Sequence, residues 1–196
     1  MMVMVLKIVL TPAFSLVPLL VKDHFGGGAA QLSLLEAVIG GGIVAGGLLL
    51  SAWGGFPKKV RTMALGGVGF GLAILAWGLL RGDLFGAAVL SGALLGLAIP
   101  LVDGPLMALL QSTIAPEMQG RVFSLFGSLL SLTSPIGLAL AGPISDGLGL
   151  QVWYLVAGVL ALGLSAAFVL VPSVRNLDQR AVDGQPQVEL TPAEAA

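Results

Sequence analysis

Long apolar segments alternate with short turns that hold the charges, glycines and prolines of the chain. In one stretch, a charged turn at Pro116 precedes about 24 uncharged residues, and a glycine-rich turn at Gly149 follows. Roughly 20 apolar residues at 1.5 Å each cross the ~30 Å hydrocarbon core of a bilayer. This pattern recurs and predicts six membrane-spanning helices, approximately Met2–Val21, Leu34–Trp53, Thr62–Leu80, Leu84–Leu110, Val122–Ser145 and Val152–Val171.

The composition agrees with a membrane protein and excludes several other classes. Of the 196 residues, 57% are hydrophobic and 10% are charged, whereas soluble domains carry about 25% charged residues. The net charge of -1 argues against a nucleic-acid partner. The sequence has no cysteine and a single histidine, His24, which we expect to be solvated in an outer loop. We therefore expect no enzyme activity, no metal site and no cofactor.

The basic residues predict an orientation with both termini in the cytoplasm. Short cytoplasmic loops carry an excess of lysine and arginine. In this orientation the outer loops hold Lys22 and Arg81, and the inner segments hold Lys58, Lys59, Arg61, Arg121, Arg175 and Arg180. The sequence thus predicts an all-α multi-pass domain over residues 1–172 and a disordered cytoplasmic tail over residues 173–196.

Prolines and glycines mark where helices are expected to bend or to pack closely. Pro12 and Pro18 lie in the first span, and Pro100 and Pro105 lie in the fourth, so we expect these two helices to be broken or to move. The alternative is that proline is simply commoner in membrane helices. Gly42 and Gly46 form one of several GxxxG pairs, which indicate tight packing but no particular function.

A weak internal repeat aligns the second span with the fifth. Each is the middle helix of a set of three, and the two sets cover residues of about 1–81 and 82–172. Three-helix units repeated once have opposite topology, which is a known plan for transporters.

Several segments resemble the C-terminal half of a major facilitator superfamily transporter, and the most similar branch is the macrolide-efflux type of bacterial drug exporter. They are TPAFSLVPLLVKDHFGGGAAQLSLLEAVIGGGIVAGGLLLSAWGGF, APEMQGRVFSLFGSLLSL and AGPISDGLG. The resemblance implies helices seven to twelve of a twelve-helix protein in a bacterial plasma membrane. It also implies export of amphiphilic drugs in exchange for protons, with the proton gradient in place of a cofactor.

The sequence departs from the family pattern at three places. The loop Gly54–Arg61 looks like the family's G-x-x-x-D-R-x-G-R-R motif without its aspartate. The stretch Gly142–Gly149 retains G-x-x-x-D-x-x-G but lacks the arginine and falls on the outer side. Gly142 and Pro143 resemble the Gly-Pro of the antiporter motif, which belongs to the other half of the family's fold.

Six helices are half of such a transporter. We therefore expect as partner either an N-terminal six-helix half or a second copy of this chain, besides lipid and a small amphiphilic substrate. The lack of a basic or amphipathic segment before the first span favours a fragment of a longer protein over a half-transporter that dimerises.

Asp103 is the main candidate for binding a substrate or a proton. An aspartate inside a membrane helix costs roughly 2.5–3.5 kcal/mol on insertion scales. It can therefore be a cavity-lining carboxylate that binds a proton or a cationic drug. Alternatively, it is a neutral acid, or one that bonds backbone freed by Pro105, without a transport role.

Further candidates for the same site each have a structural alternative. Glu36 is a candidate for proton entry, but Ser33 and Glu36 also have the spacing of a capping box. Gln111, Thr11 and Ser15 offer hydrogen bonds to a ligand or to their own helix backbone.

The loops offer candidates for gating. Arg121, with Lys58, Lys59 and Arg61, is a candidate for a cytoplasmic latch against the other half, although Glu117 and Arg121 also have the spacing of a local ion pair. Asp146 is an outer-end acid at the C-terminal end of its helix, where the helix dipole disfavours an anion, so we expect it near water or a cation.

If the chain is part of an exporter, we expect the first and fourth spans to face a shared polar cavity and the third and sixth spans to face lipid. The alternatives are an exporter of lipids or siderophores from the same superfamily, and a membrane module that packs against a partner without transporting anything.

Overall fold

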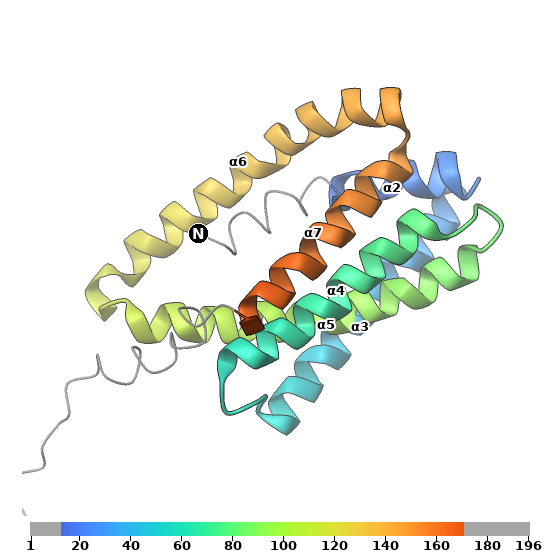
Figure 1. Cartoon of the computed structure of the whole chain (residues 1–196). Helices are drawn as coiled ribbons and strands as arrows, with labels where there is room; N and C mark the ends of the chain where they lie inside the picture. Colours follow the sequence, from blue (N-terminus) through green and yellow to red (C-terminus); the bar gives the residue numbers. More distant parts are fainter. Residues whose placement is uncertain (1–12, 171–196) are drawn as a thin grey trace, which may run out of the picture.

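The computed structural model describes residues 13–170, apart from the side chains of residue 113, of residues scattered between 130 and 148, and of residues 168–170. Every regular element in this range is a helix (Figure 1). The elements are a helical turn at residues 13–15, α2 (Val17–Leu19), the π-helix η1 (Leu20–His24), α3 (Ala29–Trp53), α4 (Lys59–Leu79), α5 (Phe85–Thr113), α6 (Pro116–Leu148) and α7 (Leu150–Leu170).

Among the described residues, four helices are long and apolar enough to cross a membrane. They are α3, α4, the part of α5 from Phe85 to Ser112, and the part of α7 from Leu150 to Ala167. The predicted second, third, fourth and sixth spans are thereby confirmed as long apolar helices. The predicted fifth span is helical within α6 but is not among these four, and most of the first lies outside the described residues. The count of six and the repeat stay predictions.

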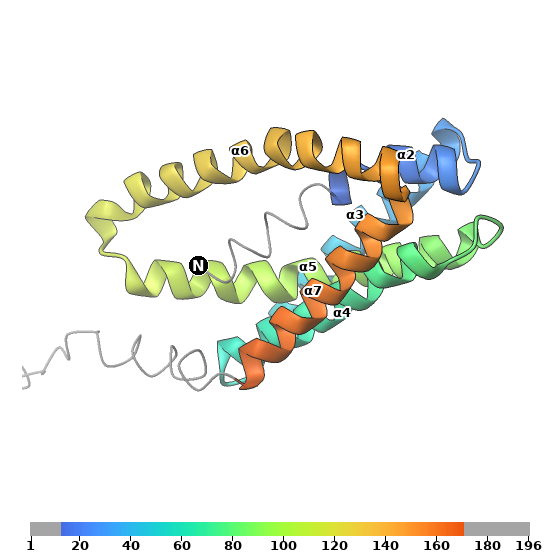
Figure 2. The same ribbon diagram turned by 45° about the horizontal axis from the view of Figure 1, so that its top comes forward.

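The described helices form a bundle in which α4 is central. Helix α4 packs against α5 and α7, and α3 packs against the other side of α5. Helix α6 lies apart from the bundle along most of its length, and its main contact is with α7 (Figures 1 and 2). Of the span of α4, 61% is buried, against 17% for α3. The expectation that the third span faces lipid is therefore wrong for most of α4 and fits only its exposed stripe, Leu65, Val68, Leu72 and Leu79.

Glycines bring α3 and α5 into backbone contact. A Cβ atom on Gly42 would lie 2.7 Å from the carbonyl oxygen of Ala93, and one on Gly46 would lie 2.6 Å from that of Leu97. No side chain fits at these distances, so the two helices approach as closely as glycine permits. In lipid, where apolar surfaces gain little by meeting each other, this backbone packing is a main source of helix association.

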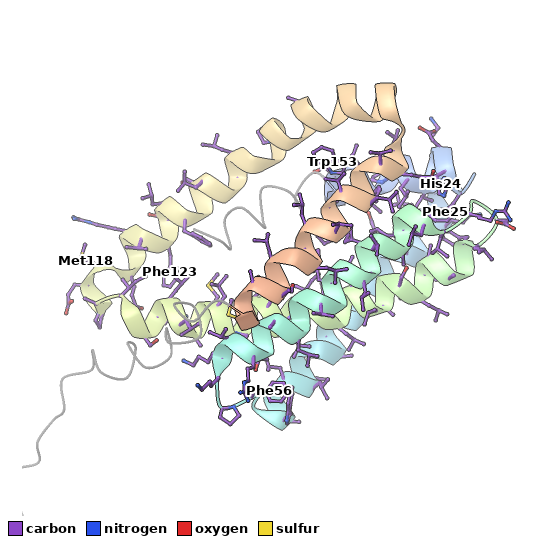
Figure 3. All side chains as sticks on the ribbon, in the orientation of Figure 1. His24, Phe25, Phe56, Met118, Phe123 and Trp153 are labelled. Atoms are coloured by element: carbon purple, nitrogen blue, oxygen red, sulfur yellow. The ribbon has the colours of Figure 1, made fainter. Side chains whose placement is uncertain are left out.

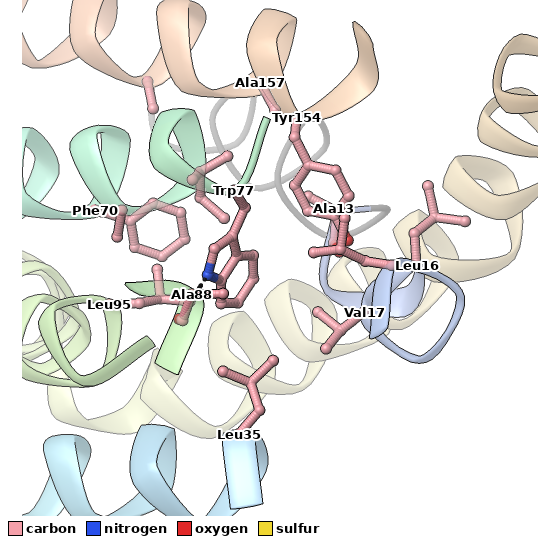
Figure 4. Close-up of a cluster of buried hydrophobic side chains, with 14 of the residues drawn as sticks. Ala13, Leu16, Val17, Leu35, Phe70, Trp77, Ala88, Leu95, Tyr154 and Ala157 are labelled. Atoms are coloured by element: carbon pink, nitrogen blue, oxygen red, sulfur yellow. Dashed lines mark hydrogen bonds between the residues drawn. The ribbon is translucent and has the colours of Figure 1, made fainter. Parts of the chain in front are cut away.

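The core lies where α4, α5 and α7 meet the first described residues (Figure 4). The Trp77 and Tyr154 rings pack edge to face, with centroids 5.9 Å apart. The indole Nε1–H of Trp77 donates to the Ala88 carbonyl at 3.0 Å, and the Tyr154 hydroxyl donates to the Ala13 carbonyl at 2.8 Å. These buried polar groups are satisfied, and Tyr154 joins α7 to the segment before α2.

Helix α3 begins earlier than the capping-box interpretation requires. Its N-cap is Gly28, and the Gly28 N–H donates to Gln31 Oε1 at 2.9 Å. Ser33 is thus inside the helix and Glu36 is in its second turn, so the prediction of a Ser33–Glu36 capping box is wrong. The physical reason is that Gly26 adopts φ +63° and Gly28 is extended, which ends the preceding helix and places a start signal before Ser33.

The prolines act differently in the two helices that we expected to break. Pro18 is the second residue of the single turn of α2, which passes directly into η1, so regular α-helix ends there. Pro12 lies outside the described residues. Helix α5 continues through both Pro100 and Pro105, so the expectation of a break there is wrong, whereas the alternative that this helix moves stays a prediction. The packing of α5 between α3 and α4 holds the helix together where its hydrogen bonds are missing.

Candidate functional site

The two ends of the bundle carry different charges. Helices α3 and α5 run in the same direction, since Leu35 meets Gly92 and Leu50 meets Gly104, and α4 runs in the opposite direction on the far side of α5 from α3. Among the described residues, one end, hereafter the basic end, has four cations and one carboxylate: Lys58, Lys59, Arg61, Arg121 and Glu117. The other, hereafter the balanced end, is nearly balanced among the described side chains: it has the cations Lys22 and Arg81 and the carboxylates Asp23, Asp83 and Glu36.

Asp103 lies nearer the basic end. Its side chain is half-buried on α5 and interacts with another group of the protein. The next residue, Gly104, faces the Leu50 side chain in the last turns of α3. The carboxylate therefore sits within an apolar helix, at the level where the loop between α3 and α4 begins.

A cavity of about 270 Å³ opens beside this level of α5, at the basic end. The connection from α3 to α4 forms it, since Gly54 and Gly55 both have positive φ and turn the chain back. The Phe56 N–H donates to the hydroxyl of the buried Thr62 at 2.9 Å, which fixes the loop over α4. The lining residues are Leu50, Gly54, Gly55, Phe56, Lys59, Thr62, Gly104, Pro105 and Ala108.

The structure does not gather the predicted substrate-binding residues in one place. Glu36 is exposed one residue beyond Leu35, which contacts Gly92. Asp103 is eleven positions further along α5, so the two acids are separated by ~16 Å along the helix axes. Gln111 is exposed near the end of α5. Ser15 is half-buried and interacts with another group of the protein, and Thr11 lies outside the described residues.

The α5–α6 turn uses a different residue from those that we predicted. The Gln119 side-chain amide donates to the carbonyls of Gln111 and Ile114, both at 3.1 Å, and so satisfies the end of α5. Glu117 and Arg121 are both exposed, and no ion pair joins these two described side chains.

The predicted outer-end residues Gly142, Pro143 and Asp146 lie in the last turns of α6, and their side chains are outside the described part of the structure. Helix α6 ends at Leu148, and Gly149 has φ +88°.

His24 is half-buried, and the expectation that it is solvated without a role is wrong. Its Nε2 lies 2.8 Å from the Leu80 carbonyl at the end of α4, and the Gln151 side chain approaches the ring at 3.3 Å. His24 and Phe25 thus connect three helices at the balanced end, opposite Phe56 (Figure 3). No pattern in the sequence points to this contact, and only the structure shows that any side chain at Gly82 would meet the His24 carbonyl.

A row of serines on α6 also escaped the sequence analysis. Ser124, Ser128 and Ser131 are exposed, and their hydroxyls donate to backbone carbonyls three or four residues earlier. Such bonds favour curvature, and α6 is curved in Figure 2. The spacing of four and three residues, which places them on one helix face, was readable from the sequence.

Known proteins that resemble this chain in sequence are named as efflux proteins, which agrees with its long apolar helices. The chain is 35% identical to macrolide efflux protein A of Streptococcus pyogenes over 167 residues, which is 85% of this chain and 41% of that protein. It is 38% identical to macrolide efflux protein A of Enterococcus faecalis over 65% of this chain and 39% of that protein.

A third relative is the multidrug efflux pump Tap of Mycolicibacterium fortuitum, 34% identical over 41% of this chain and 20% of that protein. The chain therefore spans about two fifths of the macrolide efflux relatives that it matches. No solved structure matches it.

The family profile described as Major Facilitator Superfamily matches residues 2–194, nearly the whole sequence. Together with the four long apolar helices, this match shows that the chain is a membrane protein and belongs to the Major Facilitator Superfamily.

Proposed function

We propose that the chain is the C-terminal six-helix half of a transporter that exports amphiphilic drugs, such as macrolides, in exchange for protons. The observation that carries this proposal is the 35% identity to macrolide efflux protein A of Streptococcus pyogenes over 85% of the chain. A working transporter then needs a second half, which is either an N-terminal six-helix half or another copy of this chain. The coverage of 41% of that relative supports this requirement.

The geometry suggests a division of roles. Asp103, a half-buried carboxylate in an apolar helix, is the proposed proton-binding group. The exposed serines of α6 are proposed to offer hydroxyls to the cargo along a transport path that the first described residues and α5 also face. The positive charge of the basic end favours its placement in the cytoplasm of a bacterial cell, with both chain termini on that side.

The test is transport by the chain paired with an N-terminal half from a macrolide efflux relative, in inverted membrane vesicles. We expect uptake of a labelled macrolide that needs an imposed proton gradient and that Asp103→Asn lowers at least tenfold. Asp83→Asn is the matched control, because Asp83 is an exposed acid in the loop at the balanced end.

Transport that survives collapse of the gradient would contradict proton exchange. Full transport by Asp103→Asn would remove Asp103 from the mechanism. If neither this pairing nor the chain alone moves any macrolide, the non-transporting module becomes the better interpretation.

A further inference from the structure

The cavity at the basic end has a composition that the transport proposal does not use. Its walls are mostly apolar, from Leu50, Phe56, Pro105 and Ala108. Its polar groups are the half-buried Lys59 and the Thr62 hydroxyl, which already accepts the Phe56 N–H. A ligand that fits must therefore be apolar over most of its surface and negative at one point.

The charges around the cavity favour an anion. Lys58 and Arg61 flank Lys59 in sequence, so three cations lie within four residues. The described acids at this end are Glu117, which is exposed in the α5–α6 turn, and Asp103, which precedes the lining residue Gly104 and already interacts with another group. No carboxylate is among the lining residues of this cavity.

Aromatic side chains place the cavity at the level of lipid headgroups. The Trp53 and Phe56 rings pack edge to face with centroids 4.7 Å apart, and they are 44% and 39% exposed. Exposed tryptophan at the end of a membrane helix is typical of the membrane–water interface. Figure 3 shows Phe56 at the end of the bundle, where α3 turns into α4.

We propose that this cavity is a binding site for an anionic phospholipid. The headgroup phosphate pairs with Lys59, which lines the cavity, and the upper part of an acyl chain lies against Leu50, Pro105 and Ala108. Basic pockets between membrane helices on the cytoplasmic side recognise such headgroups. The site holds lipid against both α3 and α5, the two helices that meet through Gly42 and Gly46. It does not depend on what the protein transports.

The test is lipid binding to the purified full chain in detergent, followed by native mass spectrometry. We expect dioleoyl phosphatidylglycerol to bind at least fivefold more tightly than dioleoyl phosphatidylcholine. Lys59→Gln should weaken phosphatidylglycerol binding about fivefold and so remove the preference for this lipid. The reason is that each cation near an anionic lipid surface contributes about fivefold to the affinity. Lys59→Arg should retain it.

Two further variants separate the pocket from general surface charge. Ala108→Leu fills the cavity without changing any charge, and we expect it to weaken phosphatidylglycerol binding as well. Lys22→Gln removes an exposed lysine at the balanced end and should leave binding unchanged. Circular dichroism of each variant confirms that it is folded before its binding is compared.

Three results would overturn the proposal. They are equal binding of the two lipids, an equal effect of Lys22→Gln and Lys59→Gln, and no effect of Ala108→Leu. Complete competition by glycerol 3-phosphate would show a site for a soluble anion and would likewise reject the lipid. Because transport is not measured, failure here leaves the drug-export proposal standing, and failure of transport leaves this one standing.

Discussion

Helices α4 and α6 are both long, yet they relate to the rest of the chain in opposite ways. Helix α4 is enclosed by α5 and α7, and its Trp77 forms part of the core. Helix α6 contacts mainly α7 and exposes both a row of serines and large apolar side chains, Leu125, Leu129 and Leu132. The other helices of this chain therefore bury most of α4. Helix α6 instead leaves apolar and polar side chains exposed, and a second half of the transporter or lipid would have to cover them.

The largest expected effect contrasts a glycine of the bundle with a glycine of α6. Gly46→Ala should destabilise the protein by about 1–3 kcal/mol, because a methyl group would meet the backbone of Leu97. Gly127→Ala has no atom within 4 Å to meet and should be neutral or stabilise α6 by up to about 1 kcal/mol. Thermal unfolding in detergent measures both. Equal losses would show that α6 is packed as tightly as α3.

A second contrast removes one hydroxyl from each region. Tyr154→Phe should cost about 1–2 kcal/mol, since the buried Ala13 carbonyl loses its donor. Ser128→Ala removes an exposed hydroxyl that bonds only its own helix, so stability should change by less than about 0.5 kcal/mol.

A double variant of the α6 serines tests function. In the paired vesicle assay described above, the double variant Ser128→Ala, Ser131→Ala should lower macrolide transport severalfold while its unfolding temperature stays unchanged. Transport at the parent rate would show that this face of α6 does not touch the cargo.

The smallest expected effect concerns the balanced end. His24→Ala should cost about 1 kcal/mol, because the Leu80 carbonyl at the end of α4 loses its partner. His24→Gln offers a side-chain amide as a replacement donor and should recover part of the loss. Hydrogen exchange at the amides near the end of α4 measures the local opening, and unchanged exchange in both variants would contradict the contact.

The sequence predicted the apolar helices well because their length and hydropathy are local properties. The ends of α4 and α7 fall within a few residues of the prediction, and the long run of α5 is as expected. The start of α3 was missed because two signals compete within eight residues, and the glycines before Ala29 prevail over Ser33. Whether Pro100 and Pro105 break α5 depends on what packs beside them, which no local pattern contains.

The candidate site was harder to predict, because a site requires residues from different helices to meet. Asp103 could be selected from its cost in an apolar helix, but the ~16 Å separation from Glu36 depends on the register between α3 and α5. That register follows from the close approach of Gly42 and Gly46 to Ala93 and Leu97. The contact of Thr62 with Phe56 likewise depends on the fold of one loop, since both residues look ordinary in sequence.

The single residue between α6 and α7 limits how these helices can move. Gly149, with φ +88°, is the whole connection between Leu148 and Leu150. Two helices joined by so short a link cannot slide past each other along their axes, so the distance between their joined ends is constant. Displacement of α6 by any partner is therefore restricted to a swing about Gly149, and its far end, near Pro116, travels the greatest distance.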